Sequence, residues 1–258
     1  MTIDALLAIS YRDLLKFLRD PMRLVWSFVF PLLLIGVFGG IMQANLGESI
    51  GFNYLAFVFT GVFAYTLFMS ASEGVISLID DRESDFSQEL LVSPVSRYTI
   101  VLGKIVGESL VALPRGLAIL LMGSVLGVPT TPLLLLELFL VGTLGTLLGA
   151  SFGVMLLGNF DNRRTANQVV PFIMFPQLFL AGVMTPIGVL PWYLEILSRI
   201  SPMRYAVDLA RGIYFGPDAQ AGVTVLASPA SNLIVMAAMF AGFLVVGTIL
   251  FVRRERRR

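Results

Sequence analysis

Apolar runs long enough to cross a lipid bilayer recur along nearly the whole chain. A spanning α-helix needs about 20 consecutive, predominantly apolar residues. Hydrophobic residues make up 57% of the chain and charged residues only 14%, which leaves too little polar surface to cover a water-soluble fold. The sequence therefore predicts an all-α polytopic membrane protein with six transmembrane helices, over residues 24–42, 54–72, 101–126, 132–157, 169–184 and 233–252.

No polar block between these runs is long enough to form a second core, so we expect residues 1–258 to form a single transmembrane domain. In the segment 1–20, apolar residues share one helical face and charged residues occupy the remainder. This pattern predicts an amphipathic helix that lies in the membrane interface. A soluble amphipathic helix packed on a partner protein would show the same pattern, and Pro21 ends the helix in either case.

The segment 185–230 separates the fifth run from the sixth and is too apolar for a free loop. Prolines interrupt it at Pro186, Pro191, Pro202, Pro217 and Pro229. Backbone at membrane depth must satisfy its own hydrogen bonds, so short broken helices are the expected form. We predict an extracytoplasmic re-entrant helical region here.

The distribution of Lys and Arg predicts that both termini are cytoplasmic, because cytoplasmic segments carry an excess of these residues. With the N-terminus inside, Arg199, Arg204 and Arg211 lie outside and Arg115 lies within the third run, so fourteen of the eighteen basic residues remain inside. The Arg-rich tail 253–258 directly follows the last run, which favours an anchor at anionic lipid over a nucleic-acid-binding patch. We expect a bacterial or archaeal cell membrane, with membrane lipids and no nucleic acid among the partners.

The sequence lacks the groups that most catalytic sites need. Histidine and cysteine are both absent, so no metal site is predicted, and the G-x-S-x-G pattern around Ser151 lacks the base that a hydrolase serine requires. Instead, Gly145, Gly149 and Gly153 repeat every four residues, which predicts a smooth stripe for close helix packing. No G-x-x-x-x-G-K-[ST] loop occurs. We therefore expect no catalytic residue and no ATP-binding site in this chain.

The segment 80–96 is the longest charged stretch between the runs, and it lies on the predicted cytoplasmic side. Ser84 can cap a short helix that Pro94 ends. In such a helix Phe86, Leu90 and Leu91 turn to one side and polar residues turn to the other. A short amphipathic helix between two spans suits attachment to a partner, although a plain interfacial connector has the same composition.

Two blocks of the sequence carry a known pattern. The first consists of Arg82, Glu83, Glu89, Leu90, Leu91, Pro94, Arg97, Gly103 and Lys104. The second, between residues 179 and 212, consists of Gly182, Pro186, Leu190, Pro191, Pro202, Tyr205 and Arg211. The first resembles the cytoplasmic loop of the ABC-2 family of exporter permeases, which includes daunorubicin-type drug and polysaccharide exporters. The second resembles that family's Gly-x-x-x-Pro, Leu-Pro, Asn-Pro-x-x-Tyr and terminal Arg pattern. Ser201 stands where the family often has Asn, and Asp85 where Gly is frequent.

The resemblance covers essentially the whole chain, and it implies a transporter of two permeases and two ABC ATPase subunits. The second permease would be an identical copy or a close paralogue. The segment 80–96 would be the coupling helix that docks in a groove of the ATPase, and we expect Phe86 and Leu90 to be its docking anchors. ATP and Mg²⁺ would be bound by the partner subunit, so this chain would bind no cofactor. The expected cargo is drug-like, lipidic or lipid-linked.

Charged residues within or at the ends of the predicted spans include Glu73, Glu108, Arg115 and Glu137. Each would cost about 2.5 to 3.5 kcal/mol if it faced lipid at the bilayer centre, so we expect these side chains to face protein, water or the interface. Glu108 and Arg115 share a helix face at a separation of about 10 Å, and both can line one cavity. Either they contact substrate headgroups, or Arg115 pairs with a carboxylate on a neighbouring helix and holds the bundle together.

Other classes of protein also combine many spans with no ATP site. A secondary transporter or channel would be expected to show inverted repeats and buried ion relays, and no internal repeat is visible in this sequence. An intramembrane enzyme acting on lipids or peptides is disfavoured by the absence of His and Cys.

Overall fold

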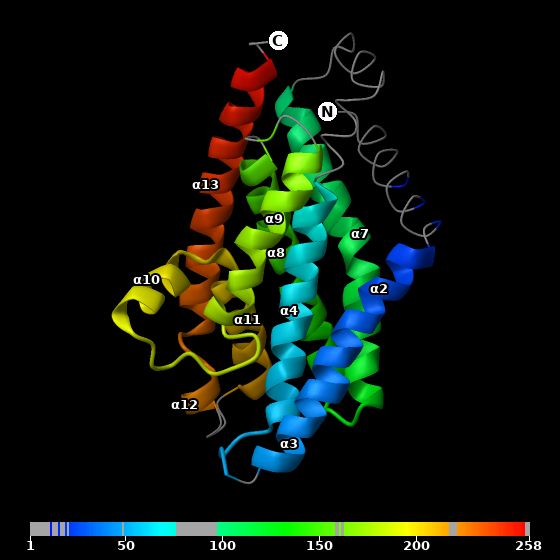
Figure 1. The fold of residues 1–258 in the computed structure, drawn as a ribbon, viewed down its shortest axis with the longest axis vertical. Helices are drawn as coiled ribbons and strands as arrows, with labels where there is room; N and C mark the ends of the chain where they lie inside the picture. The colour runs from blue at the N-terminus through cyan, green and yellow to red at the C-terminus, as the bar shows by residue number, and fades with distance from the viewer. Residues whose placement is uncertain are drawn as a thin grey trace.

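The computed structural model describes residues 11, 15, 19, 21–47, 49–75, 97–157, 160, 163–216 and 221–255. All regular structure within these residues is helical, which confirms the all-α prediction. Figure 1 shows a bundle of long helices, in the order α2 (Pro21–Leu32), η1 (Leu33–Gly39), α3 (Gly40–Leu46), α4 (Tyr54–Gly74), α7 (Arg97–Val125), α8 (Pro132–Leu157), α9 (Arg163–Leu180), α10 (Trp192–Ile200), α11 (Pro202–Phe215), α12 (Ala221–Thr224) and α13 (Pro229–Glu255). The segment 80–96 lies wholly, and the segment 1–20 almost wholly, outside the described residues, so both helices expected there stay predictions.

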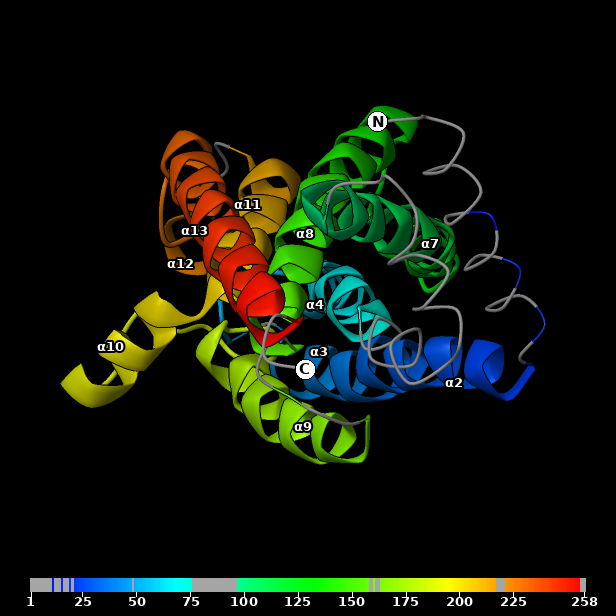
Figure 2. The same cartoon turned by 90° about the horizontal axis from the view of Figure 1, so that it is seen from above.

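Helix α4 lies at the centre of the bundle (Figure 2). Its apolar residues are spread round the whole circumference, which is typical of a helix that other helices cover on all sides. It packs against α7, α8, α11 and η1. Asn53 caps its N-terminus, because the Asn53 side-chain oxygen accepts a hydrogen bond from the Ala56 N–H at 2.9 Å. Every other long element is therefore positioned with respect to α4 or to a helix that contacts it.

Glycines allow α8 to approach α4 closely. A Cβ atom on Gly153 would lie 2.6 Å from the Ser72 carbonyl oxygen, and a Cβ atom on Gly149 would overlap the Phe68 carbonyl group. Ser72 Oγ donates a hydrogen bond to the Gly149 carbonyl at 2.5 Å. A Cβ atom added to Gly145 would meet only a side chain of α11, at 3.8 Å, which is an ordinary van der Waals distance. The predicted packing role is thus confirmed for Gly149 and Gly153, while Gly145 faces a different helix.

Five helical stretches of the described chain are long and apolar enough to cross a membrane: Val25–Leu46, Tyr54–Gly74, Val101–Val125, Pro132–Leu156 and Gly222–Leu250. They correspond to five of the six predicted runs. The first is continuous through α2, η1 and α3, and the π-helical segment η1 closely follows Pro31, which lacks an N–H for the regular helical ladder. The remaining run, 169–184, corresponds to α9, which does not belong to these five, so the count of six spanning helices is not confirmed.

Helix α9 ends at Leu180, four residues before the end that we predicted from hydropathy. The Gly182 N–H donates to the Phe179 carbonyl at 2.9 Å, and the Val183 N–H donates to the Leu178 carbonyl at 3.1 Å. These two bonds form a Schellman motif, which ends a helix and needs a residue with positive φ. Gly182 has a φ of +70°, a conformation that glycine adopts without strain. The predicted boundary at residue 184 was therefore wrong, because hydropathy does not detect a turn made of apolar residues.

The segment 185–230 contains the short helices α10, α11 and α12 and the first two residues of α13. Pro202 occupies the first turn of α11, where the N–H that proline lacks would have had no helical partner. Helix α11 packs against α4, α8 and α13, whereas α10 projects from the side of the bundle (Figure 1). The prediction of short broken helices is confirmed, and their re-entry into the membrane stays a prediction.

Candidate functional site

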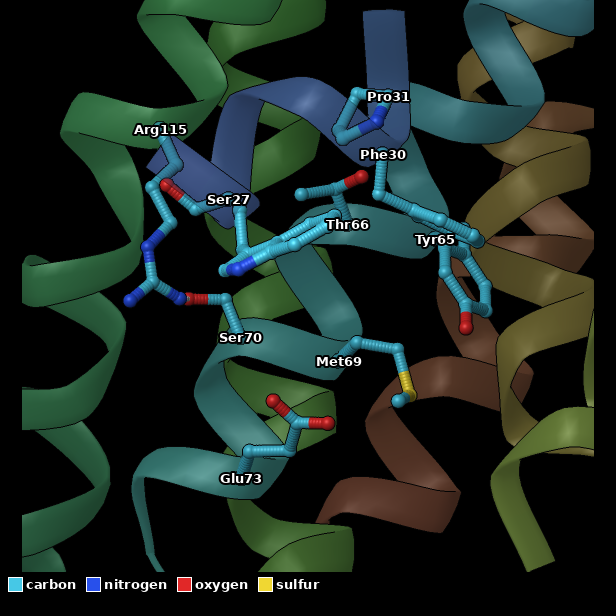
Figure 3. Close-up of a pocket in the computed structure, with 10 residues that line it drawn as sticks. Ser27, Phe30, Pro31, Tyr65, Thr66, Met69, Ser70, Glu73 and Arg115 are labelled. Carbon is cyan, nitrogen blue, oxygen red and sulfur yellow. Dashed lines mark hydrogen bonds between the residues drawn. The ribbon is translucent and has the colours of Figure 1, made fainter. Parts of the chain in front are cut away.

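A cavity lies between α2, α4 and α7 (Figure 3). Its volume is about 260 Å³. Side chains from α2 and α4 form most of the lining, and Arg115 is the one contribution from α7. The cavity therefore brings together three helices whose lining residues are far apart in the sequence.

The cavity carries two opposite charges. Arg115 is only 6% exposed, and its Nη1 donates a hydrogen bond to Ser70 Oγ on α4. Glu73 follows Ser70 by three residues, so it lies about one helical turn further along the same face of α4, and its side chain is exposed. Figure 3 shows Arg115 reaching across to Ser70 and Glu73 further along the helix. A buried guanidinium and an exposed carboxylate thus border one space.

Aromatic and polar groups share the remaining wall. The rings of Phe30 and Tyr65 lie 6.4 Å apart between centroids and are tilted by 44°. Trp26 lines the same cavity and is 61% exposed. The Thr66 hydroxyl is buried and has no hydrogen-bond partner within the described part of the chain. Aromatic walls with a few polar and charged groups suit an amphipathic ligand.

The structure separates Glu108 from Arg115, although the sequence allowed both to line one cavity. Glu108 forms an ion pair of 2.7 Å with Lys104, one turn earlier on α7, and both side chains are buried. Its carboxyl group also packs against Gly74 at the end of α4. The carboxylate that borders the Arg115 cavity is Glu73 instead. Glu137 is exposed on the second turn of α8, away from this cavity.

Arg211 joins α11 to α4 and to the turn after α9. It is 1% exposed, and its Nη2 donates to the Gly182 carbonyl at 2.5 Å, to the Val183 carbonyl at 3.2 Å and to the Phe57 carbonyl at 3.4 Å. The guanidinium carbon also lies 3.5 Å from the centroid of the Phe57 ring. We call Arg211 with these three carbonyl groups the carbonyl clamp. The clamp holds the turn after α9 against the N-terminal half of α4, where Tyr54 adds a hydrogen bond of 2.6 Å to the carbonyl of residue 184.

Other residues of the second sequence block shape the ends of the short helices. Pro191 precedes the first residue of α10, and Tyr205 on α11 donates through its hydroxyl to the Arg199 carbonyl at 2.8 Å. Pro186 is exposed in the connection before α10.

Glu195 on α10 accepts hydrogen bonds from Arg199 at 2.7 Å and from an arginine of α11 at 3.4 Å. The hydrogen bond from Arg199 lowers the pKa of Glu195, so this carboxylate stays ionised near neutral pH.

Two buried polar residues of this region were missed by sequence reasoning. Asp208 on α11 accepts hydrogen bonds from the backbone N–H groups of Leu226 and Ala227 at 2.7 and 2.9 Å, and from Asn232 Nδ2 at 2.7 Å. Gln177 on α9 accepts a bond of 3.0 Å from the hydroxyl of residue 201. Neither residue belongs to a recognisable motif, so the one available signal was that a buried polar group requires partners.

The residues predicted to couple this chain to a partner all lie outside the described part of the structure: Arg82, Glu83, Phe86, Glu89, Leu90, Leu91 and Pro94. Their role stays a prediction. Helix α4 ends at Gly74 and α7 begins at Arg97, so the segment 80–96 connects the central helix to the helix that carries Arg115.

Comparisons with known proteins agree on one family. The family model described as ABC-2 type transporter matches residues 4–215. The inner membrane transport permease YadH of Escherichia coli (strain K12) is 25% identical over 221 residues, which cover 82% of this chain and 83% of the relative. A ycf38 transport permease of Cyanophora paradoxa is 27% identical over 222 residues, which cover 82% of this chain and 74% of the relative. A ycf38 transport permease of Pyropia yezoensis is 28% identical over 224 residues, with coverage of 82% and 74%.

Proposed function

We propose that this chain, which belongs to the ABC-2 type transporter family, is the membrane-spanning permease subunit of an ATP-driven exporter. The permease provides the path through the bilayer and catalyses no reaction. A separate ABC ATPase subunit binds ATP and Mg²⁺ and supplies the energy. The observation that carries this proposal is the family match over residues 4–215, which includes the segment 80–96. The cargo is drug-like, lipidic or lipid-linked and leaves the cytoplasm.

The proposed topology has six spanning helices, with α9 as the fifth. In this topology both termini are cytoplasmic, and the segment 185–230 is an extracytoplasmic re-entrant region. The concentration of basic residues in the segments then assigned to the cytoplasm supports this orientation. The length of α9, 18 residues, is within the range of about 17–25 that spans a bilayer.

The central helix α4 is the element that transmits the movement. After its C-terminal end at Gly74 the chain continues into the proposed coupling helix, and near its N-terminus the carbonyl clamp attaches it to α9 and α11. A push from the ATPase on the segment 80–96 then moves α4 and the re-entrant region together. This movement shifts the permease between inward-closed and outward-open packings, which is a population shift driven by differential binding of the partner.

A second permease copy completes the path in this proposal. Helix α9 lies at the edge of the bundle (Figure 2) and exposes Phe172, Phe175 and Phe179, which are 82%, 63% and 51% exposed. Phe175 and Phe179 also contact each other edge to face, with centroids 5.6 Å apart. A helix with such an apolar outer face suits contact with lipid on one side and with another permease on the other.

The coupling assignment is tested by placing charge on the apolar face of the segment 80–96. The variant carries Phe86→Asp and Leu90→Asp, and the matched control carries Gln88→Asp on the predicted polar face. We expect the double variant to insert normally into the membrane but to lose ATP-dependent transport and co-purification with the ATPase. The control should retain both. Normal coupling in the double variant would exclude Phe86 and Leu90 as docking anchors.

A further inference from the structure

We infer that the cavity between α2, α4 and α7 binds the zwitterionic headgroup of an amphipathic lipid, with its phosphate at Arg115 and its ammonium group at Glu73. The binding itself follows from the cavity. The direction in which the bound molecule moves rests on the proposed export function.

The two charges of the cavity define the ligand class. Arg115 is a permanent cation with a planar set of N–H donors, which suits the oxygens of a phosphate group. Glu73 borders the same cavity with a carboxylate. A purely anionic ligand would be repelled by Glu73, and a purely cationic ligand would be repelled by Arg115. A ligand that carries both charges is attracted at both ends and leaves the site electrically neutral.

The spacing of Glu73 from Ser70, the residue to which Arg115 is hydrogen-bonded, suits such a ligand. Ser70, which accepts the hydrogen bond from Arg115, lies three residues before Glu73 on α4. Positions at this spacing are neighbours on one helix face, at about 5–6 Å between Cβ atoms. The two-carbon linker between phosphate and ammonium in an ethanolamine or choline headgroup spans a distance of this order. The Trp26 and Tyr65 rings border the same cavity, and aromatic faces attract ammonium groups.

The size of the cavity and its surroundings favour a headgroup over a whole drug-sized molecule. Its volume of about 260 Å³ lies below the range of about 300–1,000 Å³ that is typical of drug-sized ligands. Apolar side chains of α2 and of the adjoining η1 are exposed, among them Val25 on α2 at 54% and Leu33 and Val37 on η1 at 50% and 51%. A lipid can therefore place its headgroup in the cavity while its acyl chains stay along α2 within the bilayer.

The position of the cavity along α4 agrees with loading from the cytoplasmic leaflet. Ser70 and Glu73 belong to the last two turns of α4, which ends at Gly74 just before the proposed cytoplasmic segment. In the proposed orientation, a lipid of the inner leaflet reaches the cavity sideways without crossing the bilayer centre. Lys104 and Glu108, two other buried charged residues of α7, form an ion pair with each other and do not line the cavity.

The test measures which lipid the purified permease retains. The protein is equilibrated with equal amounts of phosphatidylethanolamine and phosphatidylglycerol, and the bound lipids are counted by native mass spectrometry. We expect the native chain to prefer the ethanolamine lipid. Glu73→Gln removes the attraction for the ammonium group and the repulsion of the anionic lipid, so the ratio should fall about tenfold, the change that loss of one charge-assisted contact produces. Glu137→Gln, which neutralises an exposed carboxylate elsewhere, should leave the ratio unchanged.

Two further measurements locate the binding. Arg115→Gln should reduce retention of both lipids, and Arg115→Lys should restore part of it. Because Arg115 is buried and its replacement can impair folding, the exposed Glu73 carries the decisive comparison. The chain has two tryptophans, so Trp192→Phe leaves Trp26 as the single tryptophan, which can be excited selectively at wavelengths longer than those that tyrosine absorbs. Ethanolamine lipid with brominated acyl chains should then quench Trp26 more strongly than brominated phosphatidylglycerol does.

An identical lipid ratio in the native chain, Glu73→Gln and Glu137→Gln would overturn the inference. Equal quenching of Trp26 by both lipids would do the same. These measurements use the permease without the ATPase, so they can fail while the coupling experiment on the segment 80–96 succeeds. The reverse combination would keep the lipid site and exclude Phe86 and Leu90 as docking anchors.

Discussion

Replacing Gly149 by alanine should destabilise the bundle, although alanine favours a helix more than glycine does. The added Cβ would overlap the Phe68 carbonyl and approach the Phe68 Cα to 2.9 Å. These are backbone atoms of a buried helix, so no side-chain rotation relieves the overlap, and α4 and α8 must separate. Overpacking of this kind costs about 1–3 kcal/mol. The hydrogen bond of 2.5 Å from Ser72 Oγ to the Gly149 carbonyl would be strained by the same movement.

Gly145→Ala is the matched control, because it lies one turn earlier on the same helix and gains the same helix propensity. Its new Cβ would lie 3.8 Å from its nearest neighbour, which is ordinary contact. We therefore expect the thermal midpoint in detergent to be lower for Gly149→Ala than for Gly145→Ala. At about 2–4 °C per kcal/mol, the difference should be about 2–12 °C. Equal midpoints for the two variants would refute close backbone packing of α8 on α4.

Two further substitutions test the region after α9. Arg211→Met should lower the free energy of unfolding by about 2–4 kcal/mol, because two carbonyl groups just after α9 lose a buried charged donor. Arg211→Lys should lower it less. Thermal unfolding in detergent measures both effects, and equal thermal midpoints for the Met, Lys and Arg forms would contradict the carbonyl clamp. In Asp208→Asn, an NH₂ group takes the place of a carboxylate oxygen that accepts a hydrogen bond from a backbone N–H. Hydrogen exchange at the Leu226 and Ala227 amides should therefore become faster, by about tenfold if the lost hydrogen bond contributed about 1.4 kcal/mol. Unchanged exchange at both amides would show that Asp208 does not hold this turn.

The sequence predicted the elements that depend on average hydropathy. Five of the predicted runs match helices that are long and apolar enough to cross a membrane, because a run of that length has few other stable forms. The end of α9 was misplaced because Gly182 ends the helix through its backbone conformation, in a stretch that is apolar on both sides. Helix boundaries of this kind depend on one residue and are invisible to a window average.

The candidate site was predictable in its residue types but not in its pairings. The sequence identified Glu73, Glu108 and Arg115 as charges that must be compensated, and position on one helix favoured grouping Glu108 with Arg115. The structure groups Arg115 with Ser70 and Glu73, because α7 packs beside α4 and the contact across helices is shorter than the seven-residue separation along α7. Such pairings depend on how two helices are rotated and shifted relative to each other, which cannot be read from the residues of either helix alone. Arg211 was identified by resemblance alone, and its carbonyl partners became evident only from the fold.

In the proposed function, this permease moves its cargo with energy from another protein. The direct measurement is export of an amphipathic lipid, labelled on its acyl chain, in sealed vesicles that contain the permease with or without its ABC ATPase, in the presence of ATP and Mg²⁺. We predict transport only when the ATPase, ATP and Mg²⁺ are all present, and none with an ATPase variant that cannot hydrolyse ATP. Transport of equal rate by the permease alone, driven by an ion gradient or by no energy source, would exclude ATP-driven export and indicate a secondary transporter or a channel.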